Sequence, residues 1–241
     1  MRVRVPRPVP GALFDAALAA VLTAVLAGCG TSAASPAAAP APTYHGLQPA
    51  PVPSRPEFVL TDTTGALYDF AARTRGRPTF VYFGYTHCPD ECPTAMADLA
   101  AALRKAPSPQ ARVVFVTTDP ARDSAPVLRR WLDQFSTSVI GLRGTAAQIA
   151  RAQQAVGIPA ATRGPSVPTV PGHPDQHVHA QGTAPHQHFG PLGYSVSHSA
   201  VIFAYDAADR LPVLYAGGVT PSDIAADLPV LLDPAHPRST P

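Results

Sequence analysis

Apolar runs alternate with polar, turn-forming stretches between residues 57 and 233, and their periods predict strands and helices. Two short apolar segments, 57–60 and 67–70, flank the polar sequence Asp62-Thr63-Thr64-Gly65, which predicts a β-hairpin. Residues 79–85 and 112–118 carry β-branched and aromatic side chains at almost every position. Such continuous runs are typical of strands that are buried on both faces of a sheet.

Helical periodicity occupies the stretches between and after these strands. It predicts helices that begin near Pro93 and end before Pro107, and that span 125–135, 145–156 with Thr145 as N-cap, and 220–232. The remaining apolar segments predict a short strand at 139–142 and a closing hairpin formed by 199–205 and 211–216. Because strands and helices alternate, we expect a parallel core sheet. The order of elements predicts an α/β domain with a thioredoxin-like fold and an N-terminal hairpin extension.

The N-terminal residues have the pattern of an export signal. Arg2, Arg4 and Arg7 precede an apolar run, 16–27, that is too short to stay in a bilayer as a spanning helix. The run ends in Leu26-Ala27-Gly28-Cys29, which resembles the lipobox of bacterial lipoproteins, where the cysteine is lipidated and becomes the mature N-terminus. The alternative is a core cysteine after an ordinary helix, and Asp15 beside the run is a discordant residue.

We therefore expect residues 1–29 to be a lipoprotein signal peptide, with Cys29 as the lipid anchor. The protein is then expected on the outer face of the cytoplasmic membrane. Residues 30–56 are mostly Ala, Pro and Ser, and they cannot bury enough apolar surface to offset the entropy of ordering, so they predict a flexible tether. The folded domain is predicted at 57–233, followed by a loose tail, 234–241.

Charge gives no indication of a nucleic-acid partner. The chain has 18 basic and 16 acidic residues, and removal of Arg2, Arg4, Arg7 and Asp15 with the signal leaves 15 of each. A nearly neutral domain has no basic stripe for phosphate contacts.

Cys88 and Cys92 are the only cysteines besides Cys29, and they lie between the strand 79–85 and the next helix. In a helical turn their sulfurs fall on one face, close enough to share a metal or to form a disulfide. The positive end of the helix dipole lowers thiol pKa and favours the thiolate, which serves both as nucleophile and as soft-metal ligand. Outside the cytoplasm such thiols become oxidised unless they are reduced or metal-bound, so we expect an upstream thiol reductant.

His198 is the candidate for a third ligand. It comes just before the strand 199–205, and in a thioredoxin-like sheet the loop before that strand faces the cysteine loop. Two sulfurs and one imidazole suit copper in either oxidation state. A single histidine is equally consistent with a polar loop residue, so the residues alone leave metal binding and disulfide exchange both open.

Four sequence blocks, in order, resemble the signature blocks of the Sco/SenC family. The blocks are Tyr85-Thr86-His87-Cys88-Pro89-Asp90-Glu91-Cys92-Pro93, Thr118-Asp119-Pro120-Ala121-Arg122-Asp123, Ile140-Gly141-Leu142-Arg143-Gly144 and Tyr194-Ser195-Val196-Ser197-His198-Ser199. Members of that family are membrane-tethered, thioredoxin-like copper proteins that help to metallate the binuclear copper centre of cytochrome c oxidase. The resemblance implies that the copper-bearing subunit of the oxidase is the partner.

The resemblance also implies roles for individual residues. It makes Cys88, Cys92 and His198 the ligands of copper, as Cu(I), Cu(II) or both. It marks His87 and Asp119 as candidates for orienting those ligands, although Asp119-Pro120 is equally explained as a turn between a strand and a helix. One departure is Ser197, which stands where members of the family commonly carry an acidic residue.

A histidine-rich loop insertion is predicted at 158–191, because this stretch is rich in Pro, Gly and Thr and has no apolar periodicity. It contains five of the nine histidines of the chain: His173, His177, His179, His186 and His188. A cluster of imidazoles beside a copper site could capture Cu(II), nickel or zinc before the metal passes inward. The alternative is a solvated insertion whose histidines have no role.

The sequence thus predicts an extracytoplasmic copper chaperone that turns over no substrate. The alternative is an enzyme, a thiol-disulfide oxidoreductase that keeps cysteines of an oxidase subunit or of other exported proteins reduced; one cysteine attacks a partner disulfide and the other resolves it. Peroxide reduction also needs an activated thiolate, but we find no feature of the chain that favours it.

Overall fold

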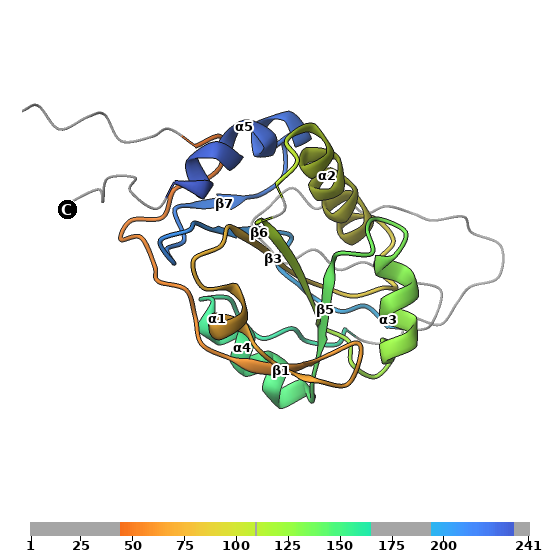
Figure 1. Cartoon of the computed structure of the whole chain (residues 1–241). Helices are drawn as coiled ribbons and strands as arrows, with labels where there is room; N and C mark the ends of the chain where they lie inside the picture. Colours follow the sequence, from red (N-terminus) through yellow and green to blue (C-terminus); the bar gives the residue numbers. More distant parts are fainter. Residues whose placement is uncertain (1–43, 109, 165–193, 234–241) are drawn as a thin grey trace, which may run out of the picture. The chain divides into compact units, whose positions relative to one another are not determined.

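The computed structural model describes residues 44–108, 110–164 and 194–233. A seven-stranded mixed sheet with the order β2-β1-β5-β4-β3-β6-β7 forms the centre of this region (Figure 1). The strands are β1 (Val59–Asp62), β2 (Leu67–Asp69), β3 (Thr79–Gly84), β4 (Arg112–Thr117), β5 (Ile140–Arg143), β6 (Ile202–Tyr205) and β7 (Val213–Tyr215). The helices are α1 (Phe70–Thr74), α2 (Glu91–Lys105), α3 (Ala125–Leu132), α4 (Ala146–Ala155) and α5 (Pro221–Leu232).

Helices cover both faces of the sheet, and β3 shows how the two sides are divided. Successive strand residues point to opposite faces. Phe80 and Tyr82 therefore pack in one apolar cluster with side chains of α2, α3 and α5. Val81 and Phe83 pack in a second cluster with side chains of α1 and α4. Because β3 is buried on both sides, its sequence shows no polar alternation.

The pairing of β3 with its neighbours brings distant segments to one end of the sheet. β3 is parallel to β4, with Gly84 opposite Thr117, and antiparallel to β6, with Tyr82 opposite Ile202. The residues that follow β3 and β4 therefore meet the residues that precede β6. The cysteine loop, Asp119 and His198 are placed in these three segments, so strand register alone directs them to the same region.

Most predicted elements are confirmed, with boundaries shifted by a few residues. The hairpin forms between β1 and β2, and Thr145 caps α4 in a reciprocal capping box with Gln148. Helix α3 ends at Leu132 rather than near residue 135. Helix α1 was not predicted, because its five residues are too few to show a helical period.

The structure differs from the predicted tether at residues 44–56, which dock on the domain. His45 hydrogen-bonds Asp227 of α5 through its backbone N–H (3.0 Å) and its ring Nδ1 (2.6 Å). Leu47 exchanges backbone hydrogen bonds with β7, and the guanidinium of Arg55 is buried and bonds two backbone carbonyl oxygens. Backbone pairing and a buried arginine do not need large apolar side chains, which explains why composition did not reveal this docking.

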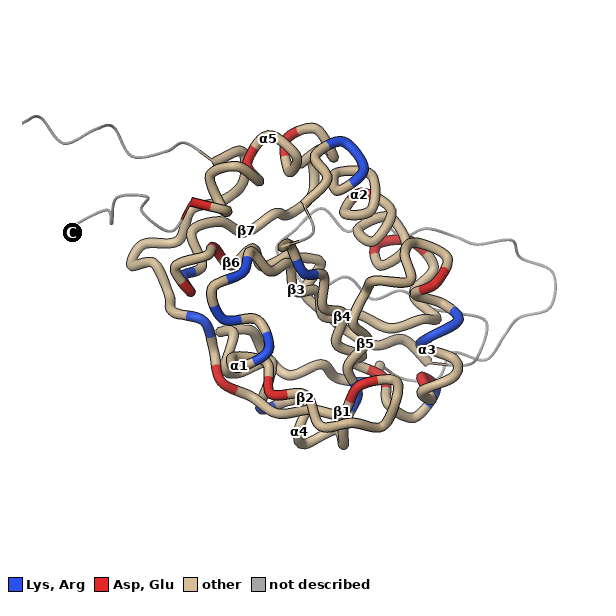
Figure 2. Tube along the Cα trace, in the orientation of Figure 1, with Lys and Arg blue, Asp and Glu red and all other residues tan. Residues whose placement is uncertain are grey.

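Several predicted segments lie outside the described residues. These are the signal peptide with Cys29, the tether up to residue 43, residues 165–193 of the insertion and the tail 234–241. Within the described ranges, none of the helices has both the length and the apolar composition that a bilayer crossing requires. Both acidic and basic side chains are spread over this part of the chain (Figure 2).

Candidate metal centre

The cysteine loop leaves β3 after Gly84 and runs into α2. Cys92 is the second residue of α2, whereas the sequence suggested that both cysteines precede the helix. Asp90 makes no side-chain capping bond, and the sulfur of Cys88 instead accepts the backbone N–H of Cys92 at 3.4 Å. Both thiols are free and buried, with exposed fractions of 5% for Cys88 and 0% for Cys92.

His198 completes a compact group with the two cysteines, as the sequence predicted. Its Nε2 lies 3.6 Å from the sulfur of Cys88 and 3.7 Å from that of Cys92, and the three candidate ligand atoms all lie within 4.8 Å of one another. In the described part of the chain, this is the one group of three or more His, Cys, Asp or Glu side chains arranged to hold a metal ion. The antiparallel pairing of β3 with β6 brings the imidazole to the sulfurs across more than 100 residues of sequence.

These distances fit a bound metal ion. For metal–sulfur and metal–nitrogen bonds of roughly 2.3 and 2.0 Å, the sulfur and nitrogen atoms are about 3.5 Å apart at a tetrahedral angle and about 3.7 Å apart at a trigonal one. The observed separations of 3.6 and 3.7 Å between the imidazole nitrogen and the two sulfurs match that range. Thiolates and imidazole are ligands for copper and zinc. Structural zinc sites use four protein ligands, and the group described offers three.

The two thiols differ in their electrostatic environment. The pKa of Cys88 is lowered to about 4, chiefly by the hydrogen bond from the Cys92 thiol, with further contributions from His198 and the backbone N–H groups of Asp90 and Cys92. Burial and the neighbouring Cys88 thiolate raise the pKa of Cys92 well above its usual value. The reduced pair therefore shares one proton, carried by Cys92. Metal binding by both sulfurs would release that proton.

Aromatic rings and a glycine shape the space around the group. The rings of Tyr82 and Tyr85 meet the imidazole of His198 edge-on, at centroid distances of 6.2 and 5.6 Å. A Cβ added to Gly84 would lie only 2.6 Å from the sulfur of Cys92. Gly84 was not among the predicted site residues, although a lone glycine at the end of an apolar strand is a signal of close approach. The Nδ1 of His198 has no hydrogen-bond partner among the described residues.

Asp123 fastens the cysteine loop to the end of β4. Its carboxylate is buried and accepts the backbone N–H of Thr86 (3.1 Å), the hydroxyl of Thr86 (2.6 Å) and the hydroxyl of Thr117 (2.5 Å). Three donors satisfy a charge that would otherwise be costly to bury. Asp123 was not among the predicted site residues. The threonines at the ends of β3 and β4 were the available signal.

His87 and Asp119 lie in the walls of the site. The Nδ1 of His87 is 3.0 Å from the hydroxyl of Thr86 and 3.8 Å from Asp123. Asp119 is buried, accepts the Tyr194 hydroxyl at 2.9 Å and forms ion pairs with Arg122 and Arg163. These bonds connect both residues to the segments that carry the ligand atoms.

The guanidinium of Arg122 links Asp119 to the imidazole. It stacks on Tyr194, 3.8 Å from the ring centroid, and lies 5.5 Å from the centroid of Tyr85. Tyr85 in turn contacts His198. Asp119 thus reaches the histidine through two intervening side chains.

The residues that flank the histidine-rich insertion pair with each other just before His198. Ser197 donates its backbone N–H to the carbonyl of Thr162 (2.9 Å), and its hydroxyl accepts the Thr162 N–H (3.0 Å). Arg163 and Val196 form a further antiparallel bridge. Ser197 is therefore engaged with Thr162. The five histidines of the insertion lie outside the described residues.

The chain is similar in sequence to a known family of proteins. The SCO1/SenC family model matches residues 48–233. "Protein SenC" of Rhodobacter capsulatus is 41% identical over 105 residues, which cover 41% of this chain and 45% of that protein. "Protein SCO2 homolog, mitochondrial" of Homo sapiens is 37% identical over 82 residues, covering 32% of this chain and 31% of the human protein. The chain thus spans less than half of the length of these curated relatives.

Solved structures extend the similarity over most of the domain. ScoI of Bradyrhizobium japonicum, solved with copper bound, has 28% identity and a TM-score of 0.56, and the match covers 74% of this chain and 99% of that one. Apo Sco1 of Thermus thermophilus has 27% identity and a TM-score of 0.59, covering 78% and 97% of the two chains. Copper-bound yeast Sco1, at 23% identity, a TM-score of 0.56 and coverage of 74% and 87%, shares the fold. The predicted thioredoxin-like fold is confirmed.

Proposed function

The chain belongs to the SCO1/SenC family, and we propose that it is an extracytoplasmic copper chaperone that binds copper through Cys88, Cys92 and His198. The observation that carries this proposal is the convergence of one imidazole nitrogen and two sulfurs at distances that suit a single metal ion. Copper is the cargo, and its recipient is proposed to be the copper-bearing subunit of cytochrome c oxidase, as the family resemblance implies.

The arrangement suits delivery rather than storage. Three protein ligands leave a coordination position that a ligand of the recipient can enter, so the metal can move by ligand exchange. Loading requires both thiols to be reduced and the Cys92 proton to be released, which is why an upstream thiol reductant is part of the proposal.

Copper titration of the reduced, purified protein tests the site. The wild type should bind about one Cu(II) with a thiolate-to-Cu(II) charge-transfer band, because the ligand is coordinated thiolate. His198→Ala should lose that band and weaken Cu(II) binding at least about tenfold, while both thiols remain titratable. His45→Ala removes an imidazole that bonds α5 instead, and should leave the band unchanged. A His198→Ala protein with an unaltered band and affinity would refute the proposed site.

A thiol-disulfide oxidoreductase is the second candidate, favoured by the asymmetry of the two thiols. The lowered pKa of Cys88 and the raised pKa of Cys92 are typical of a nucleophilic and a resolving cysteine. In this case reduction of a disulfide substrate should survive His198→Ala and be lost in Cys88→Ser. If the protein instead delivers copper, metallation of the oxidase should be lost in both His198→Ala and Cys88→Ser.

We propose that His87 and Asp119 orient the ligands, and that the five histidines of the insertion capture copper for the main site. The second proposal predicts that replacement of His173, His177, His179, His186 and His188 by Asn lowers copper uptake when metal is limiting. Uptake at saturating copper should not change. Equal uptake at limiting copper would refute metal capture.

The site of action is proposed to be the outer face of the cytoplasmic membrane, with Cys29 lipidated. The support is the sequence Leu26-Ala27-Gly28-Cys29 after a basic and apolar N-terminus. Mass spectrometry of the N-terminal peptide should show a diacylglyceryl cysteine, and Cys29→Ser should release the protein from the membrane fraction. An unmodified cysteine in the mature protein would contradict lipidation.

A further inference from the structure

Tyr82 carries a buried hydroxyl that the packing of the fold does not explain. The residue lies on β3, on the same face as Gly84, and only 1% of it is exposed. Its hydroxyl has no hydrogen-bond partner of strict geometry among the described residues. A buried hydroxyl without a partner costs free energy, and such groups in folded proteins call for an explanation.

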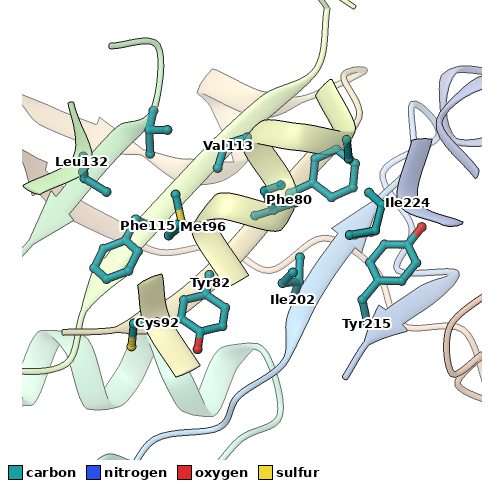
Figure 3. Packing of buried hydrophobic residues seen from close by; sticks show 14 of the residues in the cluster. Phe80, Tyr82, Cys92, Met96, Val113, Phe115, Leu132, Ile202, Tyr215 and Ile224 are labelled. Atoms are coloured by element: carbon teal, nitrogen blue, oxygen red, sulfur yellow. The ribbon is translucent and has the colours of Figure 1, made fainter. Parts of the chain in front are cut away.

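The hydroxyl is aimed at the sulfur of Cys92. Figure 3 shows the phenol oxygen of Tyr82 beside this sulfur, and the hydroxyl lowers the pKa of Cys92 against the larger effect of burial, which raises it. The space normally filled by a Cβ at Gly84 is occupied by the Cys92 sulfur and by Cε1 of Tyr82, which would lie 2.6 and 2.8 Å from such an atom. The absence of a side chain at Gly84 therefore allows the ring and the sulfur to approach each other.

A phenylalanine would fill the same volume without an unpaired polar atom. The ring of Tyr82 already contacts Phe115 and meets His198 edge-on, and both contacts need only the aromatic ring. The hydroxyl thus adds nothing to packing. A hydroxyl hydrogen can rotate about its C–O bond toward a stronger acceptor, and a thiolate is such an acceptor.

We propose that Tyr82 is a positioning residue for copper: its O–H donates a hydrogen bond to the thiolate of Cys92 when copper is bound. This inference rests on the proposed function. The sulfur of Cys92 also accepts the backbone N–H of Tyr85, so the phenol would be its second donor. Hydrogen bonds to a copper-bound cysteine sulfur tune the redox potential. Because they withdraw electron density from sulfur, they weaken its donation to Cu(II) more than to Cu(I), and Tyr82 would shift the preference of the site toward Cu(I).

The variant Tyr82→Phe tests this role in the purified, reduced protein. Loss of the donor should move the thiolate-to-Cu(II) charge-transfer band to lower energy and lower the ratio of Cu(I) to Cu(II) affinity about tenfold, which is about 59 mV for a one-electron couple. Incorporation of 3-fluorotyrosine at position 82, a stronger donor, should move the band in the opposite direction. Tyr205→Phe removes the hydroxyl of another buried tyrosine, on β6, and is the matched control.

The outcomes separate this inference from the proposed function. A band shift in Tyr82→Phe that is absent in Tyr205→Phe supports the role of the hydroxyl. An unchanged band and affinity ratio in Tyr82→Phe, or an equal shift in both variants, overturns it while leaving the copper site intact. A wild-type protein without any band that depends on His198 overturns both.

Discussion

Gly84→Ala should weaken copper binding strongly by displacing the sulfur of Cys92. The new Cβ would lie 2.6 Å from the sulfur of Cys92, 2.8 Å from Cε1 of Tyr82 and 3.2 Å from Cζ of Phe115. Ordinary van der Waals contacts begin at 3.4 Å, so the sulfur must retreat by about 0.8 Å from its present position. Gly84 is the last residue of β3, whose backbone is fixed by pairing with β4 on one side.

The expected loss of copper affinity follows from how little metal–ligand bond lengths can vary. Bond lengths in protein metal sites vary by about 0.2 Å, so a displacement of about 0.8 Å removes Cys92 from the coordination sphere. We expect copper affinity to fall at least about 100-fold, or about 2.8 kcal/mol at 1.4 kcal/mol for each factor of ten. The extra methyl in a packed core should also lower the free energy of unfolding by about 1–3 kcal/mol.

Two glycine variants separate loss of copper from loss of stability. Gly141→Ala creates similar crowding, with contacts of 2.6, 2.9 and 3.2 Å, but against Leu132, Thr63 and Leu128. It should destabilise the protein and keep copper affinity, whereas Gly217→Ala, with nothing within 4 Å of the added Cβ, should change neither. Affinity is measured by competition with a Cu(I) chelator and stability by urea unfolding. A Gly84→Ala protein that binds copper within about threefold of wild type would refute the assignment of Cys92 as a copper ligand.

Three further predictions concern residues around and away from the site. Asp119→Asn removes the charge that pairs with two arginines and should weaken copper binding about 10–100-fold without unfolding the protein. Competition with a copper chelator measures this affinity. An unchanged affinity would contradict an orienting role for Asp119. Because the pKa of Cys88 is lowered to about 4, its alkylation rate in the reduced protein, followed by peptide mass, should stay nearly constant down to about pH 5 and fall at lower pH as the thiolate is protonated. A rate that falls already below pH 9 would be inconsistent with that shift. Arg55→Met removes a buried guanidinium that pairs with the partly exposed Asp209 and donates to two backbone carbonyl oxygens, and it should cost about 1.5–3 kcal/mol in urea unfolding, with copper affinity as in wild type. A loss of affinity would mean that the docked segment influences the site.

The order of strands and helices could be predicted from the sequence because each element carries its own period. The core strands are continuous apolar runs, and the N-cap of α4 is visible as Thr145 followed by Gln148. The docking of residues 44–56 could not be predicted, because it depends on backbone pairing with β7 and on Arg55, whose partners are distant in the sequence.

The three candidate ligands and their convergence could be predicted from the sequence, but their surroundings could not. Cys88 and Cys92 stand out because cysteine is rare in this chain, and His198 stands out through its place before a strand. Tyr82 and Gly84 belong to a strand that is buried on both faces. Polar and apolar residues do not alternate in such a strand, so its sequence does not indicate which residues face the sulfurs. Their role becomes visible only when the helix that carries Cys92 packs on that face of the sheet.

The burial of the three candidate ligands indicates in which order they would release copper. Cys92 has no exposed surface, its sulfur lies beside the hydroxyl of Tyr82, and it is fixed by the first turn of α2, so an incoming ligand cannot reach the sulfur directly. Cys88 and His198 retain 5% and 7% exposure, and each belongs to a segment outside the regular strands and helices. Exchange of copper should therefore begin at Cys88 or His198, where a partner ligand can approach, and the bond to Cys92 should break last. The difference in burial between Cys92 and the other two candidate ligands would thus give the proposed copper site a direction of release.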